Sequence, residues 1–70
     1  MKLIDLHGIR HADVESILID ACSKYEIPFI VITGKSQKMK EVVARAVTHF
    51  GLHIRDSVDN PGRIIIYESG

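Results

Sequence analysis

The stretch PFIVITG, residues 28–34, decides how this 70-residue chain folds. Its apolar and β-branched residues follow one another without a charge, and the run ends in a glycine. Such a run is typical of a strand that lies inside a sheet, with a neighbouring strand on each side. We therefore predict a central strand at residues 28–34, with the rest of the chain arranged around it.

The segments on either side of this strand carry apolar residues at helical spacing. Asp13 near the start of residues 9–25 and Lys24 near their end suit the dipole of a helix, and Gly51 is placed to end a second helix. Both segments therefore predict amphipathic helices that pack on the sheet. The two apolar stripes are Val14, Ile17, Leu18, Ala21, Cys22 and Tyr25 in the first segment, and Met39, Val42, Val43, Ala46, Val47 and Phe50 in the second.

Three further stretches predict strands, namely KLIDLH (2–7), HIRDSV (53–58) and RIIIYE (63–68), with a turn at DNPG (59–62). The predicted order is therefore β-α-β-α-β-β. Strands joined through a helix run parallel with right-handed crossovers, whereas a strand that follows a tight turn runs antiparallel. We predict a single domain, residues 1–70, with an α/β fold of the α+β two-layer sandwich kind. Its mixed four-stranded sheet carries both helices on one face.

The balance of charges, the cysteine count and the lack of long apolar runs limit the classes of protein to which this chain can belong. Nine lysines and arginines balance nine acidic residues, so any argument for a nucleic-acid partner depends on local clusters of charge. Cys22 is the only cysteine, which excludes an internal disulfide, and its place on an apolar stripe predicts a small buried side chain. The sequence has neither a signal peptide nor a long apolar run, so we expect a cytoplasmic protein without a membrane partner.

The predicted topology brings several loops to one end of the sheet. Strands 2–7, 28–34 and 53–58 run in the same direction, and ligands of such sheets bind beyond the carboxyl ends of the strands. Both helices begin there and offer free N–H groups to an anion. Residues 34–40, GKSQKMK, add three lysines and no acid. The residues expected at this end are Asp5, His7, Gly8, Arg10, His11, Thr33, Gly34, Lys35, Ser36, Lys38, Asn60, Gly62 and Arg63.

An anion site at this end has a plain alternative, in which these are ordinary solvated loops.

Asp5 and His7 likewise have a functional and a structural interpretation. They share one face of their strand because side chains alternate, while Ile4 and Leu6 point to the helices. His7 then acts as a general acid or base, with Asp5 orienting it or holding a divalent cation. Alternatively, Asp5 accepts a backbone hydrogen bond and locks the turn at Gly8.

The stretch TGKS, residues 33–36, is not a Walker A motif. That motif needs a glycine five residues before Gly34, where this chain has Phe29. A glycine turn that leads into a helix remains, and it serves either as a generic phosphate cradle or only as a tight turn.

The aromatic and remaining histidine residues carry less information. Tyr67 and Phe50 are predicted in the core rather than in a base-stacking platform, and the sequence shows no aromatic RNA-recognition motif. His49 falls on the polar side of the second helix and is predicted to be a surface residue.

Three stretches together resemble the Smr (small MutS-related) domain family. LIDLHGIRHADVE (3–15) resembles its opening Leu-Asp-Leu-His-Gly signature, and FIVITGKS (29–36) resembles its apolar strand that ends in Thr-Gly-x-Gly. NPGRIIIYE (60–68) resembles its closing glycine-containing turn and strand. The resemblance spans nearly the whole chain. It implies a fold similar to the C-terminal domain of bacterial initiation factor three, nucleic-acid binding and, in several members, endonuclease or nicking activity on DNA or RNA.

The resemblance makes Asp5 and His7 candidate catalytic residues. It makes Thr33, Gly34 and Lys35 candidate residues of a phosphate-binding loop.

The chain also departs from the family pattern. Ser36 stands where the family has a second glycine, which restricts the approach of the backbone to a phosphate. Lys38 and Met39 stand where many members have histidine and serine, so one acid or base is missing while a positive charge is added. Asn60 and Pro61 interrupt the glycine-rich turn.

We therefore expect a nucleic-acid-binding domain with endonuclease activity. A non-catalytic nucleic-acid or ribosome-associated module and a small protein-interaction domain are the alternatives. The choice between RNA and DNA, the use of a divalent metal such as Mg²⁺ and homo-oligomer formation are left open.

Overall fold

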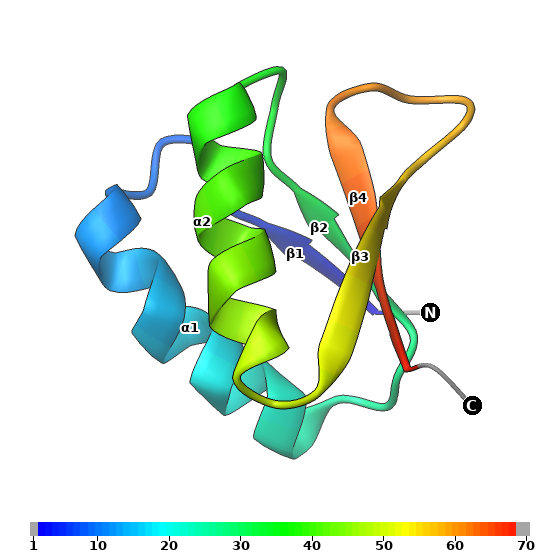
Figure 1. Ribbon diagram of the computed structural model, residues 1–70. Coiled ribbons are helices and arrows are strands. Elements are labelled where there is room, and N and C mark those ends of the chain that lie inside the picture. Colours follow the sequence, from blue (N-terminus) through cyan, green and yellow to red (C-terminus); the bar gives the residue numbers. More distant parts are fainter. Residues whose placement is uncertain (1, 69–70) are drawn as a thin grey trace.

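The computed structural model describes residues 2–68 and has six elements (Figure 1). Both helices lie on one face of a four-stranded sheet, as predicted. The predicted order and the mixed α+β architecture are therefore confirmed. The elements are β1 (Leu3–Asp5), α1 (His11–Lys24), β2 (Phe29–Ile32), α2 (Gln37–Thr48), β3 (Leu52–Asp56) and β4 (Arg63–Glu68).

The strands lie side by side in the order β1-β2-β4-β3. β1 pairs parallel to β2, and β4 pairs antiparallel to both β2 and β3, so β1, β2 and β3 run the same way. β3 does not pair with β2, because β4 lies between them. β4 carries the isoleucine run Ile64–Ile66, which suits an interior strand, whereas β3 carries His53 and Arg55, which suit an edge.

The core lies between the helices and one face of the sheet. Alternate residues of the two central strands point into it, namely Phe29 and Val31 of β2 and Ile64 and Ile66 of β4, and all are fully buried. The intervening residues point to the opposite face. The helices complete the core with Val14, Leu18 and Ala21 of α1 and Met39, Val43, Ala46 and Val47 of α2.

β1 and β2 are shorter than the apolar runs that predict them, whereas β4 has its predicted bounds. β2 ends at Ile32. The amide of Thr33 still donates to the carbonyl of Gly62 (2.9 Å), but the amide of Gly62 bonds to Oδ1 of Asn60 in its own turn, so the pairing of β2 with β4 goes no further.

β1 ends at Asp5. The amide of Leu6 still donates to the carbonyl of Ile32 in β2 (2.9 Å), and the chain then leaves the sheet through a turn at Gly8, which has a φ of +82°.

The aromatic side chains depart from expectation, and the prediction that Phe50 and Tyr67 belong to the core is wrong. Phe50 is 44% exposed because α2 ends at Thr48, which places Phe50 in the following turn. Tyr67 is half-buried and lies on the sheet face away from the helices, since its neighbour Ile66 points to the core.

Within residues 2–68, neither helix is long and apolar enough to cross a lipid bilayer.

A pair of neighbours in α1 tests the packing. Leu18 is fully buried, whereas Ile19 is 44% exposed. Leu18→Ala is expected to lower the free energy of unfolding by about 2–5 kcal/mol, because it removes buried methyl groups and leaves a cavity. Ile19→Ala, the control, is expected to lower it by roughly 0.5 kcal/mol. Urea denaturation followed by circular dichroism measures both, and equal losses would contradict the assignment of α1's faces.

Cys22 packs partly buried against the core, and this burial raises the pKa of its thiol above the ordinary value. A raised pKa leaves less reactive thiolate at neutral pH. Alkylation by iodoacetamide at neutral pH is therefore expected to be slower in the folded protein than in urea. Mass spectrometry at timed intervals measures the two rates. Equal rates would show that Cys22 is not shielded by the fold.

Candidate functional site

Three loops touch at the carboxyl end of β1 and β2. The Cδ2 atom of His7 lies 3.8 Å from the position that a Cβ on Gly34 would take. The Cα of Gly34 in turn lies 3.5 Å from the corresponding position on Gly62, in the β3–β4 turn. The predicted meeting of the loops is therefore present in the structure. We call this region, with the adjoining Lys35 and Lys38, the three-loop site.

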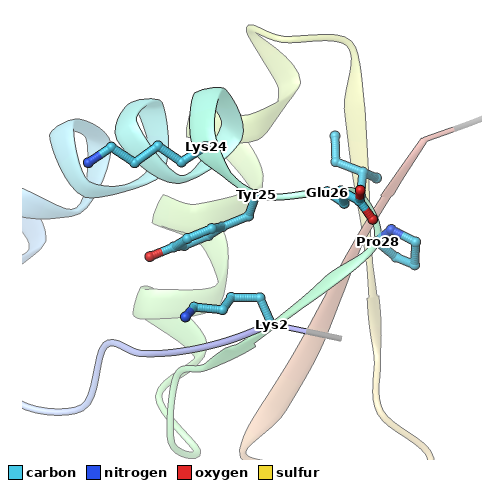
Figure 2. Close-up of a pocket in the computed structure, with 6 residues that line it drawn as sticks. Lys2, Lys24, Tyr25, Glu26 and Pro28 are labelled. Atoms are coloured by element: carbon cyan, nitrogen blue, oxygen red, sulfur yellow. The ribbon is translucent and has the colours of Figure 1, made fainter.

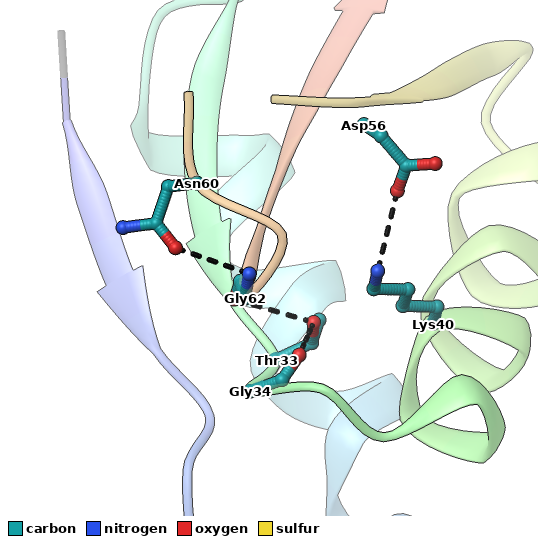
Figure 3. Close-up of polar contacts among 6 residues, drawn as sticks. All are labelled: Thr33, Gly34, Lys40, Asp56, Asn60 and Gly62. Atoms are coloured by element: carbon teal, nitrogen blue, oxygen red, sulfur yellow. Dashed lines mark hydrogen bonds and ion pairs between the residues drawn. The ribbon is translucent and has the colours of Figure 1, made fainter. Parts of the chain in front are cut away.

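Hydrogen bonds to Gly62 hold the site together (Figure 3). Its carbonyl accepts from the amides of both Thr33 (2.9 Å) and Gly34 (3.1 Å). The buried hydroxyl of Thr33 donates to the carbonyl of Gly34 at 2.8 Å, and the amide of Gly62 donates to Oδ1 of Asn60 at 3.1 Å. The amides of Thr33, Gly34 and Gly62 are thus engaged within the fold, so a phosphate at this site must be held by other donors.

The start of α2 supplies such donors. Ser36 caps the helix, and its hydroxyl accepts from the amide of Met39 at 3.1 Å. The amides of Gln37 and Lys38 occupy the first two helical positions, which have no partners inside a helix. The first turn of α2, which lies wholly within the described residues, carries no acid to offset the positive end of the helix dipole. Together with the exposed side chains of Lys35 and Lys38, this end of α2 favours an anion.

Asp5, at the end of β1, and His7, in the turn that follows, are both exposed. Oδ1 of Asp5 accepts a hydrogen bond from the backbone amide of His7 at 2.8 Å, rather than from its imidazole. The carboxylate therefore braces the turn that leads into Gly8, which is the structural alternative raised by the sequence. The ring of His7 lies near Gly34, in the loop that joins β2 to α2. A catalytic role for either residue stays a prediction.

The positive charge at this end is smaller than the sequence suggests. Lys40 pairs with Asp56 of β3 at 3.4 Å, and its side chain is only 16% exposed, so it is drawn away from the loops (Figure 3). Asp13 stands in the first turn of α1, where its charge offsets the positive end of that helix's dipole. Arg63 begins β4 and is half-buried on the sheet face away from the helices. Lys35 and Lys38 therefore carry most of the charge of the three-loop site.

His11 lies in a different setting. It lines a cavity of about 200 Å³ between α1 and α2, together with Arg45 and His49. This places it on the helical layer, whereas His7 lies against the loop glycines. His49 is exposed, as predicted.

The side chains able to coordinate a metal ion show whether one could bind here. Within residues 2–68, no group of three or more His, Cys, Asp or Glu side chains is placed to hold one. At the three-loop site a divalent cation finds the carboxylate of Asp5, and Mg²⁺ sites often combine one or two carboxylates with substrate phosphates. An all-protein metal centre does not fit these residues.

A separate cavity of about 430 Å³ lies at the opposite end of the sheet (Figure 2). It is bounded by the segments that precede β1 and β2 and by the end of α1. The ammonium of Lys2 lies 5.1 Å from the ring centroid of Tyr25, and Lys24 pairs with Asp20 at 3.1 Å. The two lysines near this cavity are therefore partnered within the chain.

Comparisons of the chain with protein-family models, with curated proteins and with solved structures gave no match. The resemblance to Smr domains accordingly rests on the three motifs of the sequence.

Asn60 is the residue whose role sequence reasoning missed, although an Asn-Pro-Gly turn is a known setting for asparagine to bond the backbone two residues on. Asn60→Ala is expected to lower the free energy of unfolding by about 1 kcal/mol, because it leaves the amide of Gly62 without its acceptor. Asn60→Asp keeps an oxygen acceptor and serves as the control. Thermal denaturation of both variants tests this, and an unchanged Asn60→Ala protein would show that the bond is dispensable.

Proposed function

We propose that this chain is an Smr-like domain that binds the phosphate backbone of nucleic acid at the three-loop site. The observation that carries the proposal is the contact of His7, Gly34 and Gly62 beside an uncompensated helix start with two exposed lysines. Lysine side chains, backbone amides and helix N-termini are the groups that proteins use to hold phosphates. A cytoplasmic location and likeness to the C-terminal domain of bacterial initiation factor three belong to the same proposal.

In this proposal the residues have distinct tasks. The side chains of Lys35 and Lys38 neutralise phosphate charge, and the amides of Gln37 and Lys38 donate to phosphate oxygens. Thr33, Gly34 and Gly62 take no part as donors, because their amides are bonded within the fold. They set the surface shape instead, since a Cβ on Gly62 would come within 3.4 Å of the Asn60 side chain and close to Gly34.

Phosphodiester cleavage is a second candidate function, favoured by the exposure of Asp5 and His7 beside the same loops. The imidazole of His7 is a usual general acid or base, and here it would move a proton to or from an oxygen of a phosphate held at the start of α2. Asp5 contributes by fixing the backbone of His7 through the 2.8 Å hydrogen bond. A divalent cation at Asp5 would add charge neutralisation to the same reaction.

The binding function predicts a salt-dependent affinity. Lys35→Ala/Lys38→Ala is expected to weaken binding of labelled RNA and DNA and to lower the salt slope by about 1–2, because each lost phosphate contact contributes roughly 0.7–0.9. Lys24→Ala is the matched control, since Lys24 lies at the far end of α1 and pairs with Asp20. Fluorescence anisotropy across a salt series measures both. Failure to bind at low salt would favour the protein-interaction alternative.

The cleavage function predicts loss of activity in two conservative variants. Asp5→Asn keeps an acceptor for the amide of His7 but removes the charge, and His7→Phe keeps a ring against Gly34 but removes both nitrogens. His7→Phe is expected to abolish cleavage of labelled single-stranded RNA or of supercoiled DNA. Asp5→Asn, which lacks the charge for a divalent cation, is expected to abolish the part of the cleavage that needs Mg²⁺, measured as the difference between Mg²⁺ and EDTA. Full activity of Asp5→Asn would assign that carboxylate a structural role. An inactive but folded wild type would leave binding as the function.

A further inference from the structure

The sheet has an open face opposite the helices (Figure 1). Strand alternation and register define it. One row crosses all four strands, because Leu3 pairs with Ile30, Ile30 with Ile65 and Ile65 with Arg55. A second row runs from Asp5 through Ile32 to Arg63. The open face therefore consists of Leu3, Asp5, Ile30, Ile32, His53, Arg55, Arg63, Ile65 and Tyr67.

Three planar side chains gather on the β3–β4 half of this face. Tyr67 lies directly opposite His53, with ring centroids 5.6 Å apart and planes inclined by 33°. The guanidinium carbon of Arg55 lies 5.9 Å from the Tyr67 centroid. His53 and Arg55 are exposed and Tyr67 is half-buried, so the group presents planar surface to solvent. We call these three residues the stacking platform.

The open face carries a net positive charge, which favours a negatively charged ligand. Its guanidinium groups are those of Arg55 and Arg63, and its one carboxylate is that of Asp5. Bases stack on tyrosine, histidine and arginine planes, and phosphates pair with arginine. A partner that combines flat apolar rings with negative charge therefore matches both properties of the surface.

The stacking platform is also continuous with the three-loop site. β4 begins at Arg63, directly after Gly62, and reaches Tyr67 about 13 Å further along at roughly 3.3 Å per residue. The side chains of Arg63, Ile65 and Tyr67 follow one another along the same face. A strand that leaves the three-loop site thus has a path along β4 to the stacking platform.

We propose that the open face binds single-stranded nucleic acid, with bases stacked on His53, Arg55 and Tyr67 and phosphates paired with Arg55 and Arg63. This inference rests on the proposed function, because the backbone of the same strand would be held at the three-loop site. It adds a preference for single-stranded over double-stranded nucleic acid. The bases of a duplex are stacked on one another, so only an unpaired strand can lay them on the platform.

A second copy of the chain is the competing occupant, since the row of Leu3, Ile30 and Ile65 is apolar. A two-fold interface places the same patch against itself. It would bring two copies of Arg55 and Arg63 into one buried surface with only Asp5 as a counter-charge. Like charges that face each other in this way are destabilising. The surface therefore favours nucleic acid over self-association.

Anisotropy with a short labelled single strand and its duplex tests the inference. The single strand is expected to bind more tightly than the duplex. Tyr67→Leu, which keeps the apolar bulk, is expected to weaken single-strand binding about 5- to 150-fold, the effect of losing one stacked base. Arg55→Gln is expected to weaken it as well, and it changes only an exposed side chain. Tyr67→Phe is expected to retain binding, and Arg45→Gln, on the helical layer, is the matched control.

The outcomes separate the inference from the proposed function. Weakening by Lys35→Ala/Lys38→Ala but not by Tyr67→Leu or Arg55→Gln would overturn the inference and leave binding at the three-loop site intact. Absence of binding to either probe at low salt would overturn both. A concentration-dependent dimer in analytical ultracentrifugation that Ile65→Lys disrupts would assign the open face to self-association and overturn the inference.

Discussion

The pairing of β4 with strands on both sides is the constraint on which the rest of the molecule depends. It buries Ile64 and Ile66 against the helices, and it forces the preceding turn onto the end of β2. There the carbonyl of Gly62 accepts from two successive amides, so the β3–β4 turn and the loop after β2 act as one unit. The same strand carries Arg63 and Tyr67 to the open face, so one element serves the core and both candidate surfaces.

In the three-loop site some polar groups hold the loops together, and others are available to a ligand. The amides of Thr33 and Gly34, which the sequence offers as a phosphate cradle, hold the turn in place instead. The carboxylate of Asp5 braces the backbone of His7 in a similar manner. The groups left to hold a phosphate are the exposed lysine side chains and the first amides of α2, with the exposed imidazole of His7 beside the same loops.

Much of the fold was predictable, and the misses share a cause. The direction of every strand follows from the order of elements and the two crossovers. The position of β4 between β2 and β3 does not follow from this order, because it depends on which strand is apolar enough to lie inside the sheet with a partner on each side. Lys40 was predicted to join the basic cluster, yet it pairs with Asp56, a residue that approaches it only once β3 is docked beside α2. The position of Tyr67 outside the core likewise depends on its strand's register.

The sequence by itself determined the elements and their order, because apolar periodicity and turn residues act over a few positions of the chain. It also determined that Asp5 faces away from the helices, since alternation along a strand is local. Only the tertiary structure decided that Gly62 reaches the amides after β2 and that His53 and Arg55 stand beside Tyr67. These contacts join segments through the sheet, and pairing partners are chosen by the burial of the whole core.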